Sequence, residues 1–296
     1  MIDQRAFITY AQYNEDVILL ALLHDVKQGY YIDVGANHPV RDSVTFLFYQ
    51  RGWRGVNIEP VKELYDQLVK HRKRDVSLNC GAGSKRGTLT LREYTETQGH
   101  STFVDLVKTD HDVSEPYHDY DVEVKALAQI IKEQGNPHIS FLKIDVEGFE
   151  YEVIKGNDWE KYRPEIVCVE ANNVKQDWSQ ILTDHAYTLF IFDGLNEYYI
   201  AKEAWRRTEG FAERVVKLDY FALKQHQFNA WSADNRQANL LQVQLDESVE
   251  RINELRQQLL TIGRLSLAGR SMPDRIRRSL YGLTIDWLRY RNKLKD

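Results

Sequence analysis

The sequence predicts an α/β protein in which helices cover the faces of a parallel sheet. Over the first 225 residues, short runs rich in β-branched and aromatic residues alternate with segments of helical periodicity. Hydrophobic residues make up 43% and charged residues 28% of the 296 residues, a composition typical of a folded chain with a sizeable core. From about residue 228 the composition changes to Gln, Asn, Arg and Leu, so we expect a domain over 1–228 and a helical extension after it.

The expected strands are short apolar runs, and the expected helices show apolar residues at helical spacing. In chain order, the strands are residues 30–34, 55–58, 76–79, 87–92 as an added hairpin strand, 141–144, 166–169, 189–192 and 220–223. The helices are residues 44–51, 61–72, 126–132 and 149–155, preceded by a first helix that begins after Asn14. Residues 94–121 are polar with little periodicity, which is typical of a lid, a binding loop or a disordered segment.

Charge and cysteine content narrow the classes of function. Residues 235–296 carry 12 Lys and Arg against seven Asp and Glu, so the rest of the chain has a net charge of −10. An acidic body is a poor partner for nucleic acid, which requires a basic surface. Cys80 and Cys168 are too few for a disulfide framework or a Cys-rich zinc site, and they favour a reducing cytosol. The first twenty residues also lack the pattern of a signal peptide.

The first motif with chemical content is YYIDVGAN at residues 30–37. An apolar strand runs into Asp33 and then into a turn at Gly35, where a glycine lets the backbone approach a ligand closely. Twenty-six residues after Asp33, the second strand ends at Glu59, which could accept hydrogen bonds from the two hydroxyls of a ribose. Together these features predict a cofactor that contains a nucleoside. The GxGxxG pattern of dinucleotide enzymes is absent, which argues against an NAD-dependent enzyme.

A second motif, FLKIDVEGFE, occupies residues 141–150. Asp145 is expected at the carboxyl end of the fourth strand, beside the same crevice, and Glu147 in the turn that follows. Two carboxylates at one strand end repel each other, and such a repulsive arrangement is typical of a functional site. Asp145 and Glu147 are therefore candidate functional residues. Glu150 is interpreted instead as a favourable charge at a helix N-terminus. The fifth strand ends in a similar way, in VCVEANN at residues 167–173.

Five stretches of the chain carry a resemblance to a known family. They are AQYNEDVIL, YIDVGANHP, GWRGVNIEP, LKIDVEGFE and RPEI, which begin at residues 11, 31, 52, 142 and 163. In order and spacing they resemble the FkbM-type S-adenosylmethionine-dependent methyltransferases, over about residues 10–223, although Tyr13 stands where the family more often has Asn. The resemblance implies a Rossmann-like fold with a mostly parallel seven-stranded sheet, S-adenosylmethionine as cofactor, and methylation of a hydroxyl on a sugar or natural product.

The resemblance also implies which residues lie along the cofactor. From the methionine end through the ribose to the adenine, they are Asp33, Gly35, Ala36, Asn37, Glu59, Pro60, Cys80, Gly81 and Ala82. Gln12 and Glu15 would close the site from the N-terminal side, with helix capping as the alternative interpretation of these two residues.

A sugar hydroxyl is a weak acid, and its proton must be removed by a base or with the help of a metal ion during methyl transfer. Asp145 or Glu147 is the preferred base. His100, in the polar loop, is the second choice because imidazole titrates near neutral pH, and a surface histidine without a role is its alternative interpretation. A third route is a divalent metal such as Mg²⁺ held by oxygen ligands at adjacent strand ends, namely Asp145, Glu170 and Asn172.

The extension after the α/β domain predicts two helices. Residues 235–262 place apolar side chains at heptad core positions, which favours a coiled coil over a helix packed on its own domain. Residues 271–296 are basic, and their expected apolar face carries Trp287 and Tyr290, as in helices that lie in a membrane interface. Docking on a partner subunit or on the body is the alternative for this second helix.

Together these features predict an O-methyltransferase that acts on a sugar hydroxyl of a cell-surface polysaccharide, such as an O-antigen, where a methyl cap would stop chain extension. The expected partners are a lipid-linked glycan acceptor, further copies of the chain through the coiled coil, and either the inner membrane surface or a glycosyltransferase at the basic helix. The enzyme would be cytoplasmic and peripheral to that membrane. The alternatives are a methyltransferase for small natural products and a degenerate methyltransferase fold that serves as an assembly scaffold.

Overall fold

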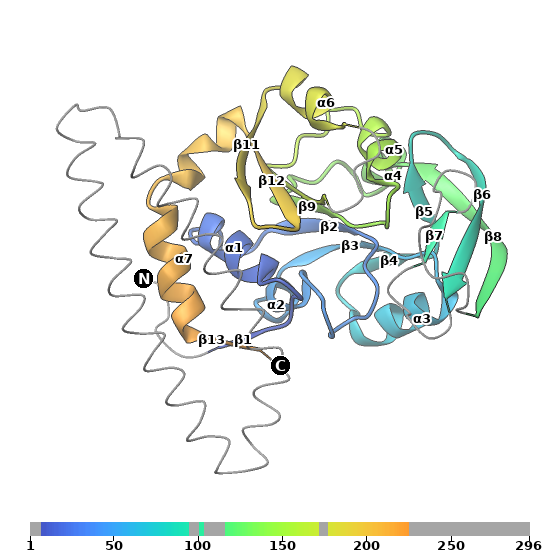
Figure 1. The fold of residues 1–296 in the computed structure, drawn as a ribbon, viewed down its shortest axis with the longest axis horizontal. Helices are drawn as coiled ribbons and strands as arrows, with labels where there is room; N and C mark the ends of the chain where they lie inside the picture. Colours follow the sequence, from blue (N-terminus) through green and yellow to red (C-terminus); the bar gives the residue numbers. More distant parts are fainter. Residues whose placement is uncertain (1–6, 95–100, 104–115, 172–176, 225–296) are drawn as a thin grey trace, which may run out of the picture. The chain divides into compact units, whose positions relative to one another are not determined.

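The computed structural model describes residues 7–94, 101–103, 116–171 and 177–224. At its centre is a seven-stranded sheet in the order β11-β12-β10-β9-β2-β3-β4 (Figure 1). Its strands are β2 (Tyr30–Val34), β3 (Arg54–Ile58), β4 (Val76–Leu78), β9 (Phe141–Ile144), β10 (Ile166–Glu170), β11 (Tyr187–Phe192) and β12 (Asn196–Ala201). The apolar residues of β9 and β10 are buried, as expected for central parallel strands that are covered on both faces.

The sheet is mixed, because β12 runs antiparallel to both β10 and β11 while the neighbouring pairs from β10 to β4 are parallel. A tight turn joins β11 to β12, so this pair needs no helical crossover. In that turn Gly194 has φ +104°, and Asp193 Oδ1 accepts hydrogen bonds from the backbone N–H groups of Leu195 and Asn196. The alternation of elements predicts a parallel sheet and the family resemblance a mostly parallel one with seven strands; the observed sheet has seven strands, and only the pairs made by β12 are antiparallel.

Helices cover both faces of the sheet. In Figure 1, α1, α2 and α3 lie below it, and α4, α5 and α6 lie above it. The bounds are α1 (Glu15–Leu22), α2 (Phe46–Gln50), α3 (Lys62–His71), α4 (Leu127–Glu133), α5 (Glu150–Lys155), α6 (Ser179–Asp184) and α7 (Phe211–Phe221), with a 3-10 helix, η1, at Lys202–Thr208. The core beneath α2 is aromatic: Phe48 packs against Trp53 and Phe141 with ring centroids 4.9 and 4.8 Å away.

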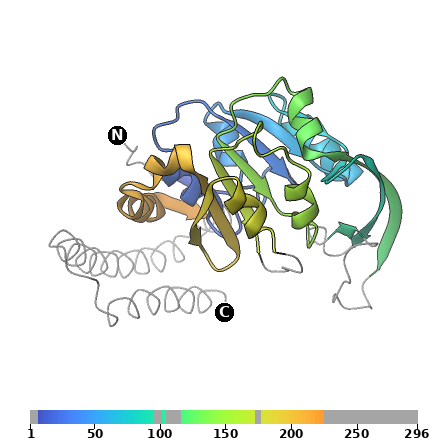
Figure 2. The same cartoon turned by 90° about the horizontal axis from the view of Figure 1, so that it is seen from above.

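Two smaller sheets complete the described structure. One has the order β5-β8-β6-β7, formed by β5 (Gly81–Gly83), β6 (Gly87–Tyr94), β7 (Thr102–Phe103) and β8 (Tyr117–Ala126). The antiparallel β6 and β8 extend beyond the central sheet in both views (Figures 1 and 2). The other sheet pairs β1 (Phe7–Thr9) in parallel with β13 (Ala222–Lys224), so it joins the first and last described strands.

The prediction of an α/β fold is confirmed, and the strands expected at 30–34, 55–58, 76–79, 141–144 and 166–169 agree with the observed bounds to within one residue. Two expectations are wrong. Residues 220–223 belong to the end of α7 and to β13 rather than to one strand, and residues 94–121 contain β7 and the first half of β8. The second error has a physical cause, because the outer half of β8 is largely exposed and therefore polar.

The predicted coiled coil at 235–262 and basic helix at 271–296 lie outside the described residues, as do His100 and Asn172. The chain divides into two compact units, Met1–Gln225 and His226–Asp296, and the structure describes residues of the first unit only. Within the described ranges, no helix combines the length and the apolar character that crossing a membrane requires.

Candidate active site

A cavity of about 280 Å³ lies at the carboxyl ends of β2, β3, β9 and β10. This edge is where open α/β sheets bind ligands. Most of the predicted site residues line it: Gln12, Asp33, Gly35, Ala36, Asn37, Glu59, Pro60, Gly81, Ala82, Asp145, Glu147 and Glu170. The motifs, which are far apart in sequence, are therefore brought to one rim by the sheet.

Asp33 is held in place at the end of β2, where it is only 1% exposed. Thr45 Oγ1 donates a hydrogen bond of 2.8 Å to Asp33 Oδ2, and the ammonium of Lys143 lies 3.5 Å from Oδ1. The next turn requires glycine, because Gly35 has φ +77° and a Cβ there would lie 1.8 Å from the carbonyl oxygen of Asp145. The close approach that the sequence predicted at Gly35 is thus an approach to the β9 turn.

Glu59, at the end of β3, is buried and connects two loops. Its Oε2 accepts a hydrogen bond of 2.7 Å from the backbone N–H of Asn37, and its Oε1 accepts one of 2.9 Å from that of Val61. Burial raises the pKa of Glu59 to about 7, although the two backbone hydrogen bonds oppose this shift. Each carboxylate oxygen has a second lone pair, so Glu59 can still accept hydroxyl hydrogen bonds from a ribose.

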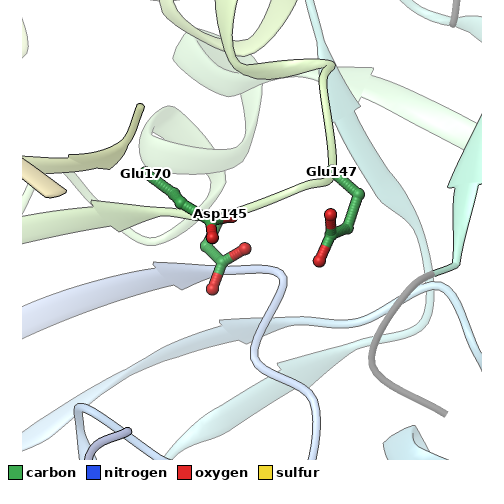
Figure 3. Close-up of side chains that lie close together, drawn as sticks. All are labelled: Asp145, Glu147 and Glu170. Carbon is green, nitrogen blue, oxygen red and sulfur yellow. The ribbon is translucent and has the colours of Figure 1, made fainter. Parts of the chain in front are cut away.

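Three carboxyl groups gather at the ends of β9 and β10 (Figure 3). One oxygen from each of Asp145, Glu147 and Glu170 lies within 4.8 Å of the others, so the group could hold a cation. Two of these residues belong to the metal set expected from the sequence, and Glu147 joins them. Burial, with the charge of Asp145, raises the pKa of Glu147 to about 8 and that of Glu170 to about 10.

The backbone of Glu147 is constrained by the second sheet. Glu147 has φ +53°, a left-handed conformation that is uncommon for a residue other than glycine, and Thr102 Oγ1 donates a hydrogen bond of 2.9 Å to its carbonyl oxygen. Thr102 belongs to β7, and Ser101 and Phe103 line the cavity beside it. Sequence reasoning missed this wall, because a two-residue strand inside a polar segment leaves no periodic signal.

Lys143 is a second residue that sequence reasoning missed. It occupies the third position of the buried strand β9, is 8% exposed, and lines the cavity. Its ammonium lies 3.2 Å from Asp145 Oδ2 and 3.5 Å from Asp33 Oδ1. Burial lowers the pKa of Lys143, but the charges of Asp145 and Asp33 outweigh that effect and raise it above its usual value. The available signal was a lysine inside an apolar run, where burial is costly unless the charge is paired.

Glu15 and Cys80 lie apart from the cavity lining in the described part of the chain. Glu15 Oε2 accepts a hydrogen bond of 2.7 Å from the backbone N–H of Tyr13, at the start of α1, and its Oε1 accepts one of 3.3 Å from Asn196 Nδ2. Glu15 thus connects the segment before α1 to the start of β12, and no side-chain hydrogen bond caps α1 at Asn14. Cys80 is buried next to Gly81, and burial raises the pKa of its thiol to about 11.

A family model described as a methyltransferase FkbM domain matches residues 33–198. The chain belongs to this family. The matched range includes the strand-end residues of the cavity rim, from Asp33 to Glu170, and family membership implies S-adenosylmethionine as the methyl donor.

Individual relatives of this FkbM domain are more distant. Methyltransferase sdnD of Sordaria araneosa is 28% identical over 193 residues, which cover 53% of this chain and 73% of that protein. Methyltransferase 1 of Beauveria bassiana is 32% identical over 117 residues, which cover 35% of this chain and 47% of that protein. A solved TehB-like SAM-dependent methyltransferase from Corynebacterium glutamicum has 7% identity and a TM-score of 0.36, over 64% of this chain and 88% of that one.

The residues that line the cavity of this FkbM domain have the chemistry needed to bind S-adenosylmethionine. Asp33 and Asp145 provide negative charge for the ammonium and sulfonium groups of such a donor, and Glu59 provides acceptors for its ribose. Gly81, Ala82 and Phe103 also line the cavity, and the ring of Phe103 packs closely against Gly81. The charged and accepting groups of the rim therefore suit the methionine and ribose parts of the donor.

Proposed function

We propose that this FkbM methyltransferase transfers a methyl group from S-adenosylmethionine to a hydroxyl oxygen of a sugar, in the assembly of a cell-surface polysaccharide. The observation that carries the O-methyl part of the proposal is the position of Glu147. This carboxyl group lies on the same cavity rim as Asp33 and Glu59, with a pKa of about 8. A base of that pKa suits a weakly acidic hydroxyl at neutral pH.

The chain's own residues would act mainly by positioning. S-adenosylmethionine supplies a methyl group that is already activated by the sulfonium. Glu59 and the turn at Gly35 hold the donor, and the cavity walls limit the access of water. Glu147 would take up the proton of the acceptor hydroxyl as that oxygen is methylated.

Asp145 is less suited to this proton transfer. Its Oδ2 lies 3.2 Å from the ammonium of Lys143, and an adjacent cation stabilises the ionised form of a carboxylate and weakens it as a base. Glu147 is instead raised in pKa by burial and by the neighbouring charges of Asp145 and Glu150. The two carboxylates that the sequence could not separate would thus have different roles, Asp145 in electrostatics and Glu147 in proton transfer.

The decisive experiment is a screen for labelled methyl transfer. Purified protein, S-adenosylmethionine with a labelled methyl group and a panel of cell-envelope glycans would be incubated with and without chelator, and products identified by mass spectrometry. A methyl ether on one sugar hydroxyl supports the proposal. Transfer to nitrogen, carbon or only small natural products would contradict it, and loss of activity with chelator would favour the route through a divalent metal.

The remaining parts of the proposal concern partners. The acceptor would be lipid-linked, residues 235–262 would join copies of the chain, and residues 271–296 would bind the inner face of the membrane or a glycosyltransferase. These proposals rest on the heptad pattern and on the positive charge of the segment 235–296. A methyl group on the terminal sugar would then end chain extension close to the membrane.

A further inference from the structure

Lys143 is a buried cation to which the proposed mechanism assigns no step of its own. The strand register places it directly opposite Asp33 across β2 and β9, and opposite Cys168 across β9 and β10. It therefore lies in the middle of the central sheet, one residue before the strand ends at the cavity. Only 8% of the residue is exposed, so its ammonium has given up most of its contact with water.

Oxygen atoms of the cavity rim surround the ammonium of Lys143. An ammonium has three N–H donors, and three acceptors surround this one. They are the carbonyl oxygen of Gly35 at 3.1 Å, Asp145 Oδ2 at 3.2 Å and Asp33 Oδ1 at 3.5 Å. The first two lie within hydrogen-bond distance, whereas Asp33 Oδ1 accepts no hydrogen bond and is paired with the ammonium by charge. Lys143 thus links the three groups to one another.

Those three groups come from separate parts of the cavity rim. Asp33 ends β2, Gly35 forms the turn after it, and Asp145 follows β9. Without a cation between them, the carboxylates of Asp33 and Asp145 would repel each other, and the carbonyl of Gly35 would lose its side-chain donor. The rim would then relax outward, or one carboxylate would take up a proton.

We propose that Lys143 is a positioning residue for the methyl donor: its ammonium fastens Asp33, Gly35 and Asp145 into one rigid rim, to which S-adenosylmethionine binds. This inference rests on the donor binding in the proposed function and adds to it the residue that holds the binding groups together. Rigid presentation of binding groups reduces the ordering cost of association, so its loss appears as weaker binding.

The test measures binding rather than turnover. The full-length chain carrying Lys143→Met would be titrated with S-adenosylhomocysteine, the demethylated product, by calorimetry well below its melting temperature. We expect the Kd to rise about tenfold or more. The KM for S-adenosylmethionine should rise in parallel. As a matched control, Lys217→Met removes the ion pair with Glu213 in α7 and should leave the Kd within about twofold.

A second pair of variants keeps the test decisive if Lys143→Met does not fold, since it leaves two buried carboxylates without their cation. Lys143→Met combined with Asp145→Asn removes one charge of each sign, and Asp145→Asn alone is its reference. The proposal expects the double variant to bind S-adenosylhomocysteine about tenfold more weakly than the reference. Equal Kd values in folded variants with and without Lys143 would overturn the inference.

The outcomes separate this inference from the proposed function. If the unaltered protein does not bind S-adenosylhomocysteine, both fail. If it binds, and the Lys143 variants melt at a lower temperature but bind with an unchanged Kd, Lys143 is only a structural residue and the inference alone fails.

Discussion

Single residues at the cavity rim determine the proposed chemistry. Asp33, Glu59 and Asp145 could be found from the sequence, because each follows an apolar strand and parallel strands end at the same edge. The protonation states of these groups could not be predicted from the sequence, because they depend on neighbours that folding brings close. Lys143 is the clearest case: its sequence context is an apolar strand, and its partners come from two strands and a turn.

Replacing Glu147 tests the proton transfer. We expect Glu147→Gln to lower kcat by roughly 10²- to 10⁴-fold, because a carboxamide cannot take up the hydroxyl proton. The Kd for S-adenosylhomocysteine should change little. In the unaltered enzyme, kcat should rise with pH up to about 8, since the base works only when ionised and its pKa is about 8. A variant with full kcat, or one that keeps this pH dependence, would contradict the assignment.

Glu15 predicts how stability depends on pH. Burial raises the pKa of Glu15 from 4.5 to about 7, so between these values the folded state binds a proton that the unfolded state does not. The contribution of Glu15 to the free energy of unfolding is therefore fully present below about pH 4.5 and is lost as the pH rises through about 7. We expect Glu15→Gln to flatten the fall in the free energy of unfolding between pH 5 and pH 7.5, measured by urea denaturation. Exposed Glu63→Gln is the control, and an equally flat curve for both would contradict this account.

At the scale of elements, the loop between β2 and α2 shows what sequence patterns leave out. Its residues Asp42, Ser43 and Val44 line the cavity, and a buried guanidinium from the end of α3 holds it. Arg72 donates hydrogen bonds to the carbonyl of Pro39 and to Ser43 Oγ, at 2.8 Å each. The strands and α3 follow from apolar periodicity, whereas this loop follows from polar contacts between residues about thirty positions apart.

Thr45 links that loop to the rim, because its hydroxyl donates to Asp33 Oδ2 at 2.8 Å and accepts from Arg72 at 3.1 Å. Thr45→Val keeps the shape and removes both hydrogen bonds. We expect a loss of about 1–3 kcal/mol in the free energy of unfolding, because two buried polar groups lose a partner. Urea denaturation measures it, with the exposed Thr88→Val in β6 as control. A loss no larger than that of the control would show that Arg72 and Asp33 find other partners.

At the scale of the whole chain, composition separated an α/β domain from an extension near residue 228, and the compact units divide at Gln225. The antiparallel edge could not be foreseen, because a strand sequence does not state its direction. In the second sheet, the added strand expected at 87–92 is confirmed as β6, whereas β7 and the polar outer half of β8 were not predicted. Both features depend on pairing between segments rather than on the segments themselves.

Truncation separates the two units. We expect a chain that ends at Gln225 to retain methyl transfer to a soluble acceptor, because the cavity lining lies within the first unit. The same truncation should reduce the oligomeric mass in light scattering and the fraction that sediments with anionic vesicles. Unchanged vesicle binding would contradict the proposed role of residues 271–296, and an unchanged mass would contradict the proposed coiled coil.

The small sheet of β1 and β13 has a mechanical consequence. The last described strand, β13, pairs in parallel with the first, β1. Lys224 Nζ, in β13, donates a hydrogen bond of 2.8 Å to the carbonyl oxygen of Gln12, and Gln12 lines the cavity. Tension applied to the chain beyond Gln225 would act first on this two-stranded sheet. A force on the chain after β13 would therefore be transmitted through Lys224 to Gln12, a residue of the cavity lining.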